Sequence, residues 1–319
     1  MMKATVIIPT HNRREWIGST IATLAAQIDV SESPELIVVT DRCTDGTADM
    51  LRSRFGERVR IIDSAGPGQP AALNTGIAAA TGKLAIFLDD EMRAAPGFVA
   101  AHLKAHQAAA GSLVAVTGYS PVLLSPNSPP LHVYLAERYE RFHRSLASGE
   151  LSRAPSGFSG MNVSVPVDQV RNAGGFNTSY FFQRNDFELG ARLIASGYSI
   201  VYAPDARADQ ELALTAESMV GRAEPRGQND ARLAREFPWS IPWLPFAAQL
   251  RSESAMRRWH AAWLARGAVG SALGGLRAVR KDNLALLRYE YAARYAVSLI
   301  RSLGGWKEFT ALAPAARSK

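Results

Sequence analysis

The sequence predicts an α/β fold, in which a mostly parallel sheet has helices on both faces and a helical extension follows. The first half of the chain alternates short apolar runs with segments of helical period, as in βαβ units. The apolar runs are nearly continuous rather than alternating, which is typical of parallel strands buried on both faces. Beyond residue 235 the pattern changes to helical periods alone.

The first half resolves into four strands with helices between them. The strand segments are "ATVIIPT" (4–10, closed by Pro9), "ELIVVT" (35–40), "VRIID" (59–63) and "LAIFLDD" (84–90). The first helix is expected from Arg14 to Ile28, because Ile17, Ile21, Leu24 and Ile28 recur at helical spacing. "TADMLRSRF" and "AALNTGIAAATG" are the next two helices, and the latter ends at Gly82.

The second half is less regular. "YSPVLLSPNSPP" is expected to be a strand that breaks into a Pro-rich loop, and "LHVYLAERYERFHRSL" an amphipathic helix. "EFPWSIPWLPF" is a Pro/Trp-rich connector. We therefore expect a domain over 1–235, divided into the halves 1–115 and 116–235, and a helical extension over 236–319.

Composition indicates a soluble globular protein. Of 319 residues, 47% are hydrophobic and 20% are charged. Cys43 is the single cysteine, which excludes an intramolecular disulfide framework and a multi-cysteine zinc site and fits a reducing compartment. The start does not resemble a signal peptide, and no apolar stretch is long enough to span a membrane. We expect a cytoplasmic protein.

The net charge of +7 is concentrated at the C-terminal end. Residues 251–319 contain thirteen Lys/Arg and four Asp/Glu, a net of 13 − 4 = +9, which leaves 7 − 9 = −2 for residues 1–250. No nucleic-acid-binding signature accompanies this charge, so no nucleic-acid partner is expected. Apolar stripes run beside the arginines, at Met256, Trp259 and Trp263 and again at Leu284, Leu287, Tyr291 and Tyr295. Three alternatives stay open for 251–319: core packing, a homo-oligomer contact, or peripheral contact with the inner face of an anionic membrane.

Polar residues follow three of the predicted strands. Thr10, Asp41 and Asp89 each fall at the carboxyl end of a strand, where open parallel sheets bind ligands. "FLDDEM" also places Asp89, Asp90 and Glu91 in a row, and three adjacent acids repel one another unless a cation lies among them. A divalent metal site and an acidic helix cap are the two interpretations.

The chain resembles the family 2 glycosyltransferases of the GT-A fold. Six stretches match that family's signature blocks in order and spacing over roughly residues 4–235, namely "VIIPTHNR", "VVTDRCTDGTAD", "GPGQPAALNTGIAAATGKLAIFLDDEM", "FSGMNVSV…AGGFN", "NDFELGARLIASGY" and "VYAPDARADQE". Each block alone is weakly specific, whereas their conjunction is strong. The resemblance implies an inverting transferase that uses a nucleotide sugar and Mg²⁺ or Mn²⁺. It also implies that 1–115 is the nucleotide-sugar-binding half of the domain and 116–235 the acceptor half.

The resemblance implies that the acidic cluster is the family's metal motif, which holds the ion against the donor diphosphate. Asp89, Glu91 and Gln210 occupy the positions of the implied metal ligands. Two departures stand out, since Glu91 replaces a more usual aspartate and Gln210 replaces a frequent histidine. A glutamine offers only a neutral amide, so weaker metal binding is expected.

The resemblance also places the nucleotide sugar. Its implied contacts are Pro9, Thr10, Asn12, Asp41, Asn74, Gly76, Asp89, Asp90, Gly160 and Asn162. An aspartate at position 41 can accept a hydrogen bond from the uracil N3–H, which favours a UDP-linked donor. The alternative for Asp41 is an Asx turn, and both roles can hold at once. For Gly160 and Asn162 the alternative to sugar contact is close packing around the glycine.

Asp186, in "QRNDFELGARL", occupies the family's position for the general base that deprotonates the acceptor hydroxyl. The first residue of the usual Glu-Asp pair is Asn185 here. A helix N-cap is the alternative for Asp186. His102 and His106 lack an intervening glutamate and are expected on an ordinary surface helix.

The sequence therefore predicts an inverting glycosyltransferase that moves a sugar to a hydroxyl of a saccharide, a lipid-linked glycan or a secondary metabolite. The alternative is a non-catalytic GT-A module that binds a nucleotide sugar or a protein partner, because Glu91, Asn185 and Gln210 all depart from the common pattern. A nucleotidyltransferase is disfavoured, since the glycine-rich basic loop of that class is absent near residue 1.

Overall fold

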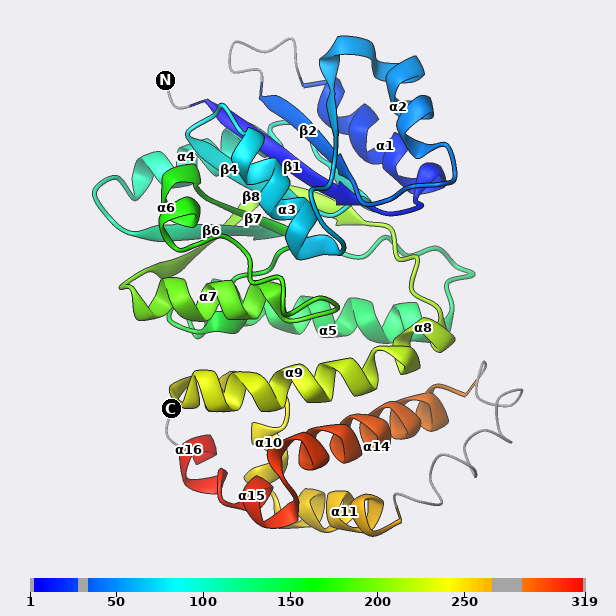
Figure 1. Ribbon diagram of the computed structural model, residues 1–319, viewed down its shortest axis with the longest axis vertical. Coiled ribbons are helices and arrows are strands. Elements are labelled where there is room, and N and C mark those ends of the chain that lie inside the picture. Colours follow the sequence, from blue (N-terminus) through cyan, green and yellow to red (C-terminus); the bar gives the residue numbers. More distant parts are fainter. Residues whose placement is uncertain (1–2, 28–33, 266–282, 318–319) are drawn as a thin grey trace. The chain divides into compact units, whose positions relative to one another are not determined.

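The computed structural model describes residues 3–27, 34–265 and 283–317. The chain forms two compact units. The sheet unit comprises 1–127, 135–181 and 185–213, and the helical unit comprises 128–134, 182–184 and 214–319 (Figure 1). The chain thus enters the helical unit briefly at 128–134 and 182–184 before it continues there from Leu214.

The sheet unit is built on one eight-stranded sheet, in the order β3-β2-β1-β4-β7-β6-β8-β5. Its strands are β1 (Ala4–Thr10), β2 (Glu35–Thr40), β3 (Arg60–Asp63), β4 (Leu84–Leu88), β5 (Met92–Ala94), β6 (Val114–Tyr119), β7 (Asn162–Pro166) and β8 (Ser199–Gln210). The first four strands along the chain pair in parallel, as predicted, and β6 and β8 are also parallel. Three pairs, β4–β7, β6–β7 and β5–β8, are antiparallel.

Helices lie on both faces of the sheet. Those of this unit are α1 (Arg14–Ala25), α2 (Thr47–Phe55), α3 (Gln69–Ala79), α4 (Phe98–Ala108), α5 (Pro130–Ala147), α6 (Val167–Asn172) and α7 (Asn185–Ala195), with 3₁₀ turns η1 (Gly56–Arg58) and η2 (Pro155–Gly157). The first turn of α5 groups with the helical unit. Helix α1 ends at Ala25, and Ile28, expected to close it, lies outside the described residues.

One face of the sheet packs on α1, α2 and α4. Val6 and Ile8 of β1 share a fully buried cluster with Ile17 of α1, Leu51 of α2 and Phe98 of α4. The opposite face of β1 packs on α3, which runs in front of the sheet in Figure 1. A Cβ added at Gly76 of α3 would lie 2.3 Å from Cγ2 of Ile7 and 3.3 Å from Cγ2 of Val39. A glycine is required there because the helix backbone rests directly on the strands.

The expectation of a surface helix at His102 and His106 is wrong. Helix α4 turns both rings toward the sheet, where His102 is fully buried and His106 is 8% exposed. Nε2 of His102 contacts Oδ1 of Asn162 at 2.9 Å, and Oγ of Ser164 lies 2.8 Å from Nδ1 of His102 and 2.9 Å from Nε2 of His106. Asn162 and Ser164 of β7 thus provide hydrogen-bond partners for the two buried histidines. The i, i+4 spacing of the histidines alone does not distinguish this arrangement from a solvated helix face.

The helical unit comprises α8 (Ala216–Gly221), α9 (Ala223–Glu236), the 3₁₀ turn η3 (Pro238–Trp243), α10 (Ala247–Leu250), α11 (Glu253–Leu264), α14 (Leu284–Leu303), α15 (Trp306–Thr310) and α16 (Ala313–Arg317). The boundary expected at residue 235 differs from the structure, where the unit resumes at Leu214. The reason is that α9 packs against α14, about seventy residues away, and this pairing is invisible to a local change of composition. The Pro/Trp connector lies inside the unit as η3.

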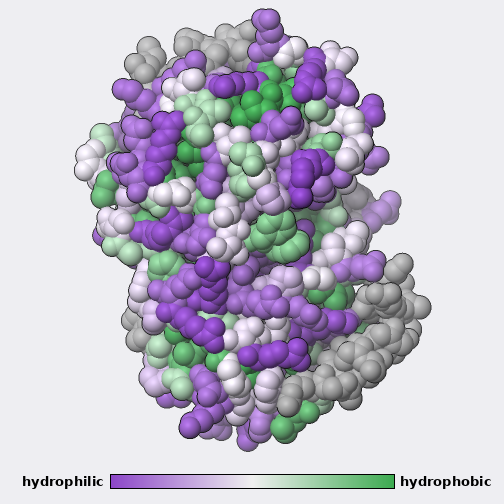
Figure 2. Space-filling model, viewed as in Figure 1, coloured by the Kyte–Doolittle hydropathy of each residue, from purple (hydrophilic) through white to green (hydrophobic). Residues whose placement is uncertain are grey.

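The apolar stripes of residues 251–319 form the core of the helical unit. Trp259 of α11 stacks on Phe309 with ring centroids 5.5 Å apart and meets Tyr295 edge-on at 5.8 Å. Leu287, Leu299 and Ile300 of α14 are also buried. Core packing is therefore the role of the buried parts of both stripes. On the face drawn in Figure 2, hydrophobic residues lie in small groups separated by hydrophilic ones. Within the described ranges, no helix has the length and apolar character needed to cross a membrane.

Candidate active site

The residues predicted at the carboxyl ends of the strands come together. Thr10 ends β1, and its Oγ1 donates to Oδ2 of Asp90 at 2.7 Å. The backbone N–H of Asp41, just past β2, donates to the carbonyl of Thr10 at 2.8 Å. Nε2 of Gln69, at the start of α3, donates to Oδ1 of Asp89 at 3.1 Å. One edge of the sheet therefore presents these side chains, as the strand order requires.

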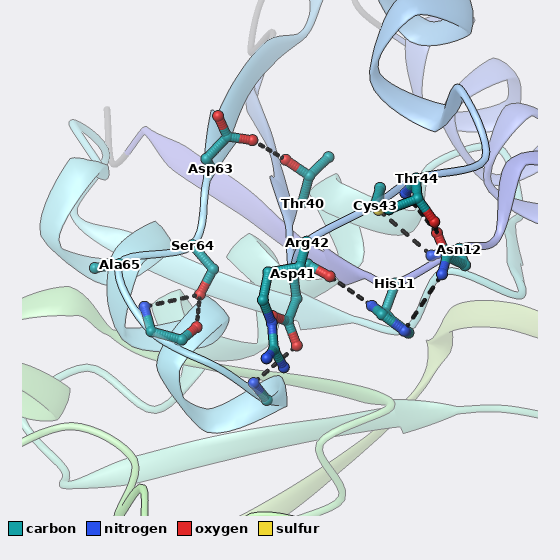
Figure 3. Close-up of polar contacts among 12 residues, drawn as sticks. His11, Asn12, Thr40, Asp41, Arg42, Cys43, Thr44, Asp63, Ser64 and Ala65 are labelled. Carbon is teal, nitrogen blue, oxygen red and sulfur yellow. Dashed lines mark hydrogen bonds and ion pairs between the residues drawn. The ribbon is translucent and has the colours of Figure 1, made fainter.

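The loops that follow β1 and β2 interlock at this edge (Figure 3). Oδ1 of Asn12 accepts from the backbone N–H of Thr44 at 2.8 Å, and Nδ1 of His11 lies 2.5 Å from the carbonyl oxygen of Asp41. Asn12 and Arg42 both have φ of 51°, in the left-handed region that side chains other than glycine rarely adopt. Asp45 caps this arrangement, since its carboxylate accepts from the backbone N–H groups of Arg14 and Thr47.

Asp41 also positions the loop before α3. Its Oδ2 accepts from the backbone N–H of Gly68 at 2.8 Å, and its Oδ1 accepts from Nε of Arg42 at 3.0 Å. The Asp41 carboxylate therefore connects the loop after β2 to the loop before α3, in place of the Asx turn considered from the sequence. A carboxylate has about four acceptor positions, so lone pairs remain for a ligand N–H.

The three adjacent acids point to different partners. Asp89 meets Gln69, Asp90 meets Thr10, and Glu91 meets Gln210, whose Nε2 donates to Oε1 of Glu91 at 2.8 Å. Burial raises the pKa of Asp90 to about 6, although the hydrogen bond from Thr10 and the charge of Arg13 act in the opposite direction. The repulsion expected from the sequence is thus relieved in part by dispersal of the three side chains.

Glu91 and Gln210 provide oxygen donors suited to a hard cation. Gln210 is 3% exposed, and its Oε1 is buried with no hydrogen-bond partner in the described structure. Oε2 of Glu91 lies 3.9 Å from a guanidinium nitrogen of Arg13. Among the described residues no three His, Cys, Asp or Glu side chains are grouped as metal ligands. Two carboxylates and an amide oxygen, as predicted for Asp89, Glu91 and Gln210, nevertheless fit the donor preference of Mg²⁺ or Mn²⁺.

Asp186 is held at the start of α7 by backbone N–H groups. Its Oδ1 accepts from the N–H of Phe187 at 2.8 Å, and its Oδ2 lies 3.4 Å from the N–H of Gly160. A Cβ at Gly160 would lie 3.3 Å from Cβ of Asp186, so the glycine allows the loop before β7 to pass close by. Asp186 therefore occupies a helix start, as its alternative role implied, and is oriented by two elements.

Gln69 links two of the candidate site residues. Its Nε2 contacts Asp89, and its Oε1 accepts from Nδ2 of Asn185 at 3.2 Å. One amide thus links the acidic cluster to the residue directly before Asp186. Residues 69 and 185 are 116 positions apart, so no local sequence pattern indicates this contact.

Three of the residues predicted to contact the nucleotide sugar also support the scaffold. The amide of Asn74 joins α3 to the loop before α7, because it bonds to both the N–H and the carbonyl of Phe176 at 2.8 Å. Gly76 is the packing point on β1. The Asn162 side chain is fully buried and donates to the carbonyl of Ala206 at 2.9 Å while it meets His102. These three residues thus have scaffold roles in the structure, and their predicted contact with the nucleotide sugar stays a prediction.

The chain belongs to glycosyl transferase family 2. The family profile matches residues 5–165, and the related profile of glycosyl transferase family group 2 matches residues 86–266. The fold and the edge of the sheet described above thus belong to a GT-A glycosyltransferase scaffold, in agreement with the resemblance stated from the sequence.

Relatives and solved structures agree with this family. The validoxylamine A glucosyltransferase of Streptomyces hygroscopicus subsp. jinggangensis is 31% identical over 223 residues, which are 60% of this chain and 51% of that protein. The glycosyltransferase AglE of Haloferax volcanii is 25% identical over 204 residues, or 63% of this chain and 64% of that protein. The chain spans about half the length of the validoxylamine A glucosyltransferases it matches.

Among solved structures, a mannosyltransferase from Pyrobaculum calidifontis in complex with GDP-Man and Mn²⁺ superposes with a TM-score of 0.61 at 22% identity, covering 93% of this chain and 87% of that one. GalNAc-T7 with UDP, GalNAc and Mn²⁺ superposes with a TM-score of 0.53 at 13% identity, covering 77% and 52%. At such identities the likeness establishes the fold.

Proposed function

We propose that the protein is an inverting glycosyltransferase that moves a sugar from a nucleotide diphosphate donor, UDP-linked, to a hydroxyl of an acceptor. The observation that carries this proposal is the pair of chemical groups at one edge of the sheet: an acidic cluster beside a buried, unpartnered amide oxygen, and an aspartate oriented by two backbone N–H groups. Family membership supplies the reaction class.

Asp186 is the proposed base. A carboxylate at this place accepts the proton of the acceptor hydroxyl as the oxygen attacks the anomeric carbon from the face opposite the leaving diphosphate. The contacts from Phe187 and Gly160 hold the carboxylate in one orientation, so its position does not have to be established during the reaction. The remaining lone pairs of the Asp186 carboxylate oxygens can accept a hydrogen bond from the acceptor hydroxyl.

Asp89, Glu91 and Gln210 are the proposed holders of Mg²⁺ or Mn²⁺. When bound, the ion supplies positive charge against the diphosphate. The unpartnered Oε1 of Gln210 supports this assignment, because a buried acceptor without a partner is costly and a cation would satisfy it. The two superposed transferases contain Mn²⁺ in their crystals.

Asp41, beside Gly68, retains acceptor capacity for the N3–H of a uracil base, as the proposed UDP-linked donor requires. For the acceptor, the similarity to a validoxylamine A glucosyltransferase supports a hydroxyl of a small saccharide-like secondary metabolite, with a saccharide or lipid-linked glycan as the other candidates. We also propose that the enzyme is cytoplasmic. Peripheral contact with the inner face of the membrane is the alternative.

A calorimetric titration of UDP at several Mn²⁺ concentrations tests the donor and metal assignments together. Wild type should bind UDP in a metal-dependent manner, and Asp89→Ala should lose that dependence because it removes a ligand charge. Gln210→His should tighten metal-dependent binding by on the order of 1 kcal/mol, since imidazole is a stronger donor than a neutral amide. Equal UDP binding by wild type in EDTA would contradict the metal site, and preferred binding of GDP would contradict the uracil assignment.

Donor hydrolysis separates an enzyme from a non-catalytic GT-A module. Slow, metal-dependent release of UDP from a UDP-sugar without acceptor supports the enzyme. Tight nucleotide-sugar binding with no hydrolysis and no transfer across an acceptor panel supports the module.

A further inference from the structure

The segment directly before the proposed base belongs to the helical unit. Residues 182–184 group with the C-terminal helices, and the chain returns to the sheet unit at Asn185. Asp186 is therefore two residues from a segment whose position is set by helices far along the chain.

Two successive residues of α9 hold this segment. Nδ2 of Asn229 donates to the carbonyl of Gln183 at 2.8 Å. The Asp230 carboxylate accepts from Nε of Arg184 at 2.6 Å and from its Nη2 at 3.0 Å, a bidentate pair. Asp230 is fully buried, and the Arg184 side chain is only 12% exposed. Bidentate pairs of this kind restrict both distance and orientation.

Helix α14 completes the arrangement. The hydroxyl of Tyr295 donates to Oδ2 of Asp230 at 2.5 Å, so the carboxylate accepts three hydrogen bonds from two partners. Burial and the neighbouring Asp230 charge raise the pKa of Tyr295 well above its ordinary value, which keeps the phenol protonated as the donor.

The backbone at Arg184 records the effect of this clamp. Its φ of 73° lies in the left-handed region, which arginine rarely adopts. Such a conformation persists only where surrounding contacts over-determine it.

We propose that Asn229, Asp230 and Tyr295 are positioning residues that fix the backbone of Gln183 and Arg184, the two residues that directly precede Asn185 and Asp186 in the chain. This inference rests on the proposed function of Asp186 as base.

A matched pair of variants in α14 tests the proposal. Tyr295→Phe removes the hydroxyl that bonds to Asp230, whereas Ser298→Ala removes a hydroxyl that bonds to the carbonyl of Glu224 in the same helix α9 at 2.8 Å. Both delete one hydrogen bond between the same two helices, but only the first touches the clamp. Tyr295→Phe is expected to lower kcat about tenfold with the KM for donor unchanged, because misplacement of a base affects the transition state. Ser298→Ala should leave kcat at the wild-type value.

Asn229→Ala provides a second variant that spares the buried ion pair and should lower kcat in the same way. Hydrogen exchange of the peptide spanning residues 181–188 is the readout independent of activity. Exchange should accelerate in Tyr295→Phe and Asn229→Ala and stay unchanged in Ser298→Ala. Equal kcat and equal exchange in all three variants would overturn the proposal. If wild type transfers no sugar, the proposed function fails, and the exchange comparison still decides whether the clamp positions this segment.

Discussion

Backbone strain in this protein is concentrated in single residues of the candidate site. Within the described ranges, the non-glycine residues with positive φ are Asn12, Arg42 and Arg184. The first two lie in the interlocked loops after β1 and β2, and the third lies two residues before Asp186. Strained backbone of this kind costs roughly 1–3 kcal/mol per residue and clusters where geometry matters for function.

Asp186→Asn should abolish transfer and leave nucleotide affinity nearly unchanged, because a base acts in the transition state. Steady-state kinetics and UDP titration measure the two effects separately. Asp168→Asn, on an aspartate exposed in the first turn of α6, is the matched control and should behave as wild type. An Asp186→Asn protein that keeps more than roughly a few per cent of kcat would contradict the base assignment.

Gln69→Ala should raise the Mn²⁺ concentration needed for half-maximal activity and lower kcat, since it removes one hydrogen bond from Asp89 and one from Asn185. We expect about a three- to tenfold change in each, corresponding to the loss of one or two partly exposed hydrogen bonds. The double variant Gln69→Ala/Asn185→Ala should be no worse than either single variant if the two amides act as a pair. Additive losses indicate separate roles.

At the scale of elements, the contact of α4 with β7 makes the fold sensitive to acid. Burial lowers the pKa of His102 to about 3 and that of His106 to about 4 from an ordinary 6.5. Ser164 donates to Nδ1 of His102 when that ring is neutral, and a proton there would oppose the donor.

The free energy of unfolding should therefore decrease as the pH is lowered. Above pH 6.5 both rings are neutral in the folded and unfolded chains. Below it the unfolded chain binds protons that the folded chain excludes, so the free energy of unfolding declines as pH falls from 6.5 toward 4, by about 2 kcal/mol per ring at pH 5. Urea unfolding between pH 4.5 and 7.5 measures this slope. His102→Gln, which can still form hydrogen bonds but does not titrate, should flatten the slope; an unchanged slope excludes His102 as its source.

The contact of α3 with β1 predicts a local packing effect. Gly76→Ala should lower the free energy of unfolding by about 1–3 kcal/mol, because the new methyl group would lie 2.3 Å from Cγ2 of Ile7. Gly221→Ala is the control, since nothing lies within 4 Å of a Cβ at the end of α8. Thermal unfolding compares the two, and equal melting temperatures would mean that α3 shifts freely.

At the scale of the whole molecule, the positive charge of residues 251–319 is separate from their apolar core. Trp259 and Tyr295 pack inside the helical unit, whereas Leu264 and Tyr289 are exposed, as are arginines such as Arg257 and Arg258. A deletion of 251–319 would remove Tyr295 and the packing of α9, and five of the thirteen basic residues lie outside the described ranges.

Flotation of the full chain with vesicles tests membrane binding without the structural damage that a deletion of 251–319 would cause. Binding to anionic vesicles should exceed binding to zwitterionic ones at low salt and disappear at high salt, at roughly 1 kcal/mol per basic residue near the surface. Arg257→Gln/Arg258→Gln should weaken it without loss of thermal stability. If the intact protein ignores anionic vesicles at low salt, the charge serves solubility or self-association.

The sequence alone determined the order of strands 4–10, 35–40, 59–63 and 84–90 and the edge at which Thr10, Asp41 and Asp89 meet. These follow from local periodicity and from the geometry of parallel strands, which need no knowledge of distant partners. The placement of Asp186 at a helix start was likewise local.

Only the tertiary structure decided what the polar side chains of the scaffold do. The burial of His102 depends on β7, the bridge made by Gln69 depends on Asn185, and the clamp on Arg184 depends on α9 and α14. Each pair is separated by 46 or more positions, and the same residue types would read as solvated surface if their partners were absent. Hydrogen bonds act over about 3 Å in space regardless of distance along the chain, so their partners are set by the packing of the finished fold.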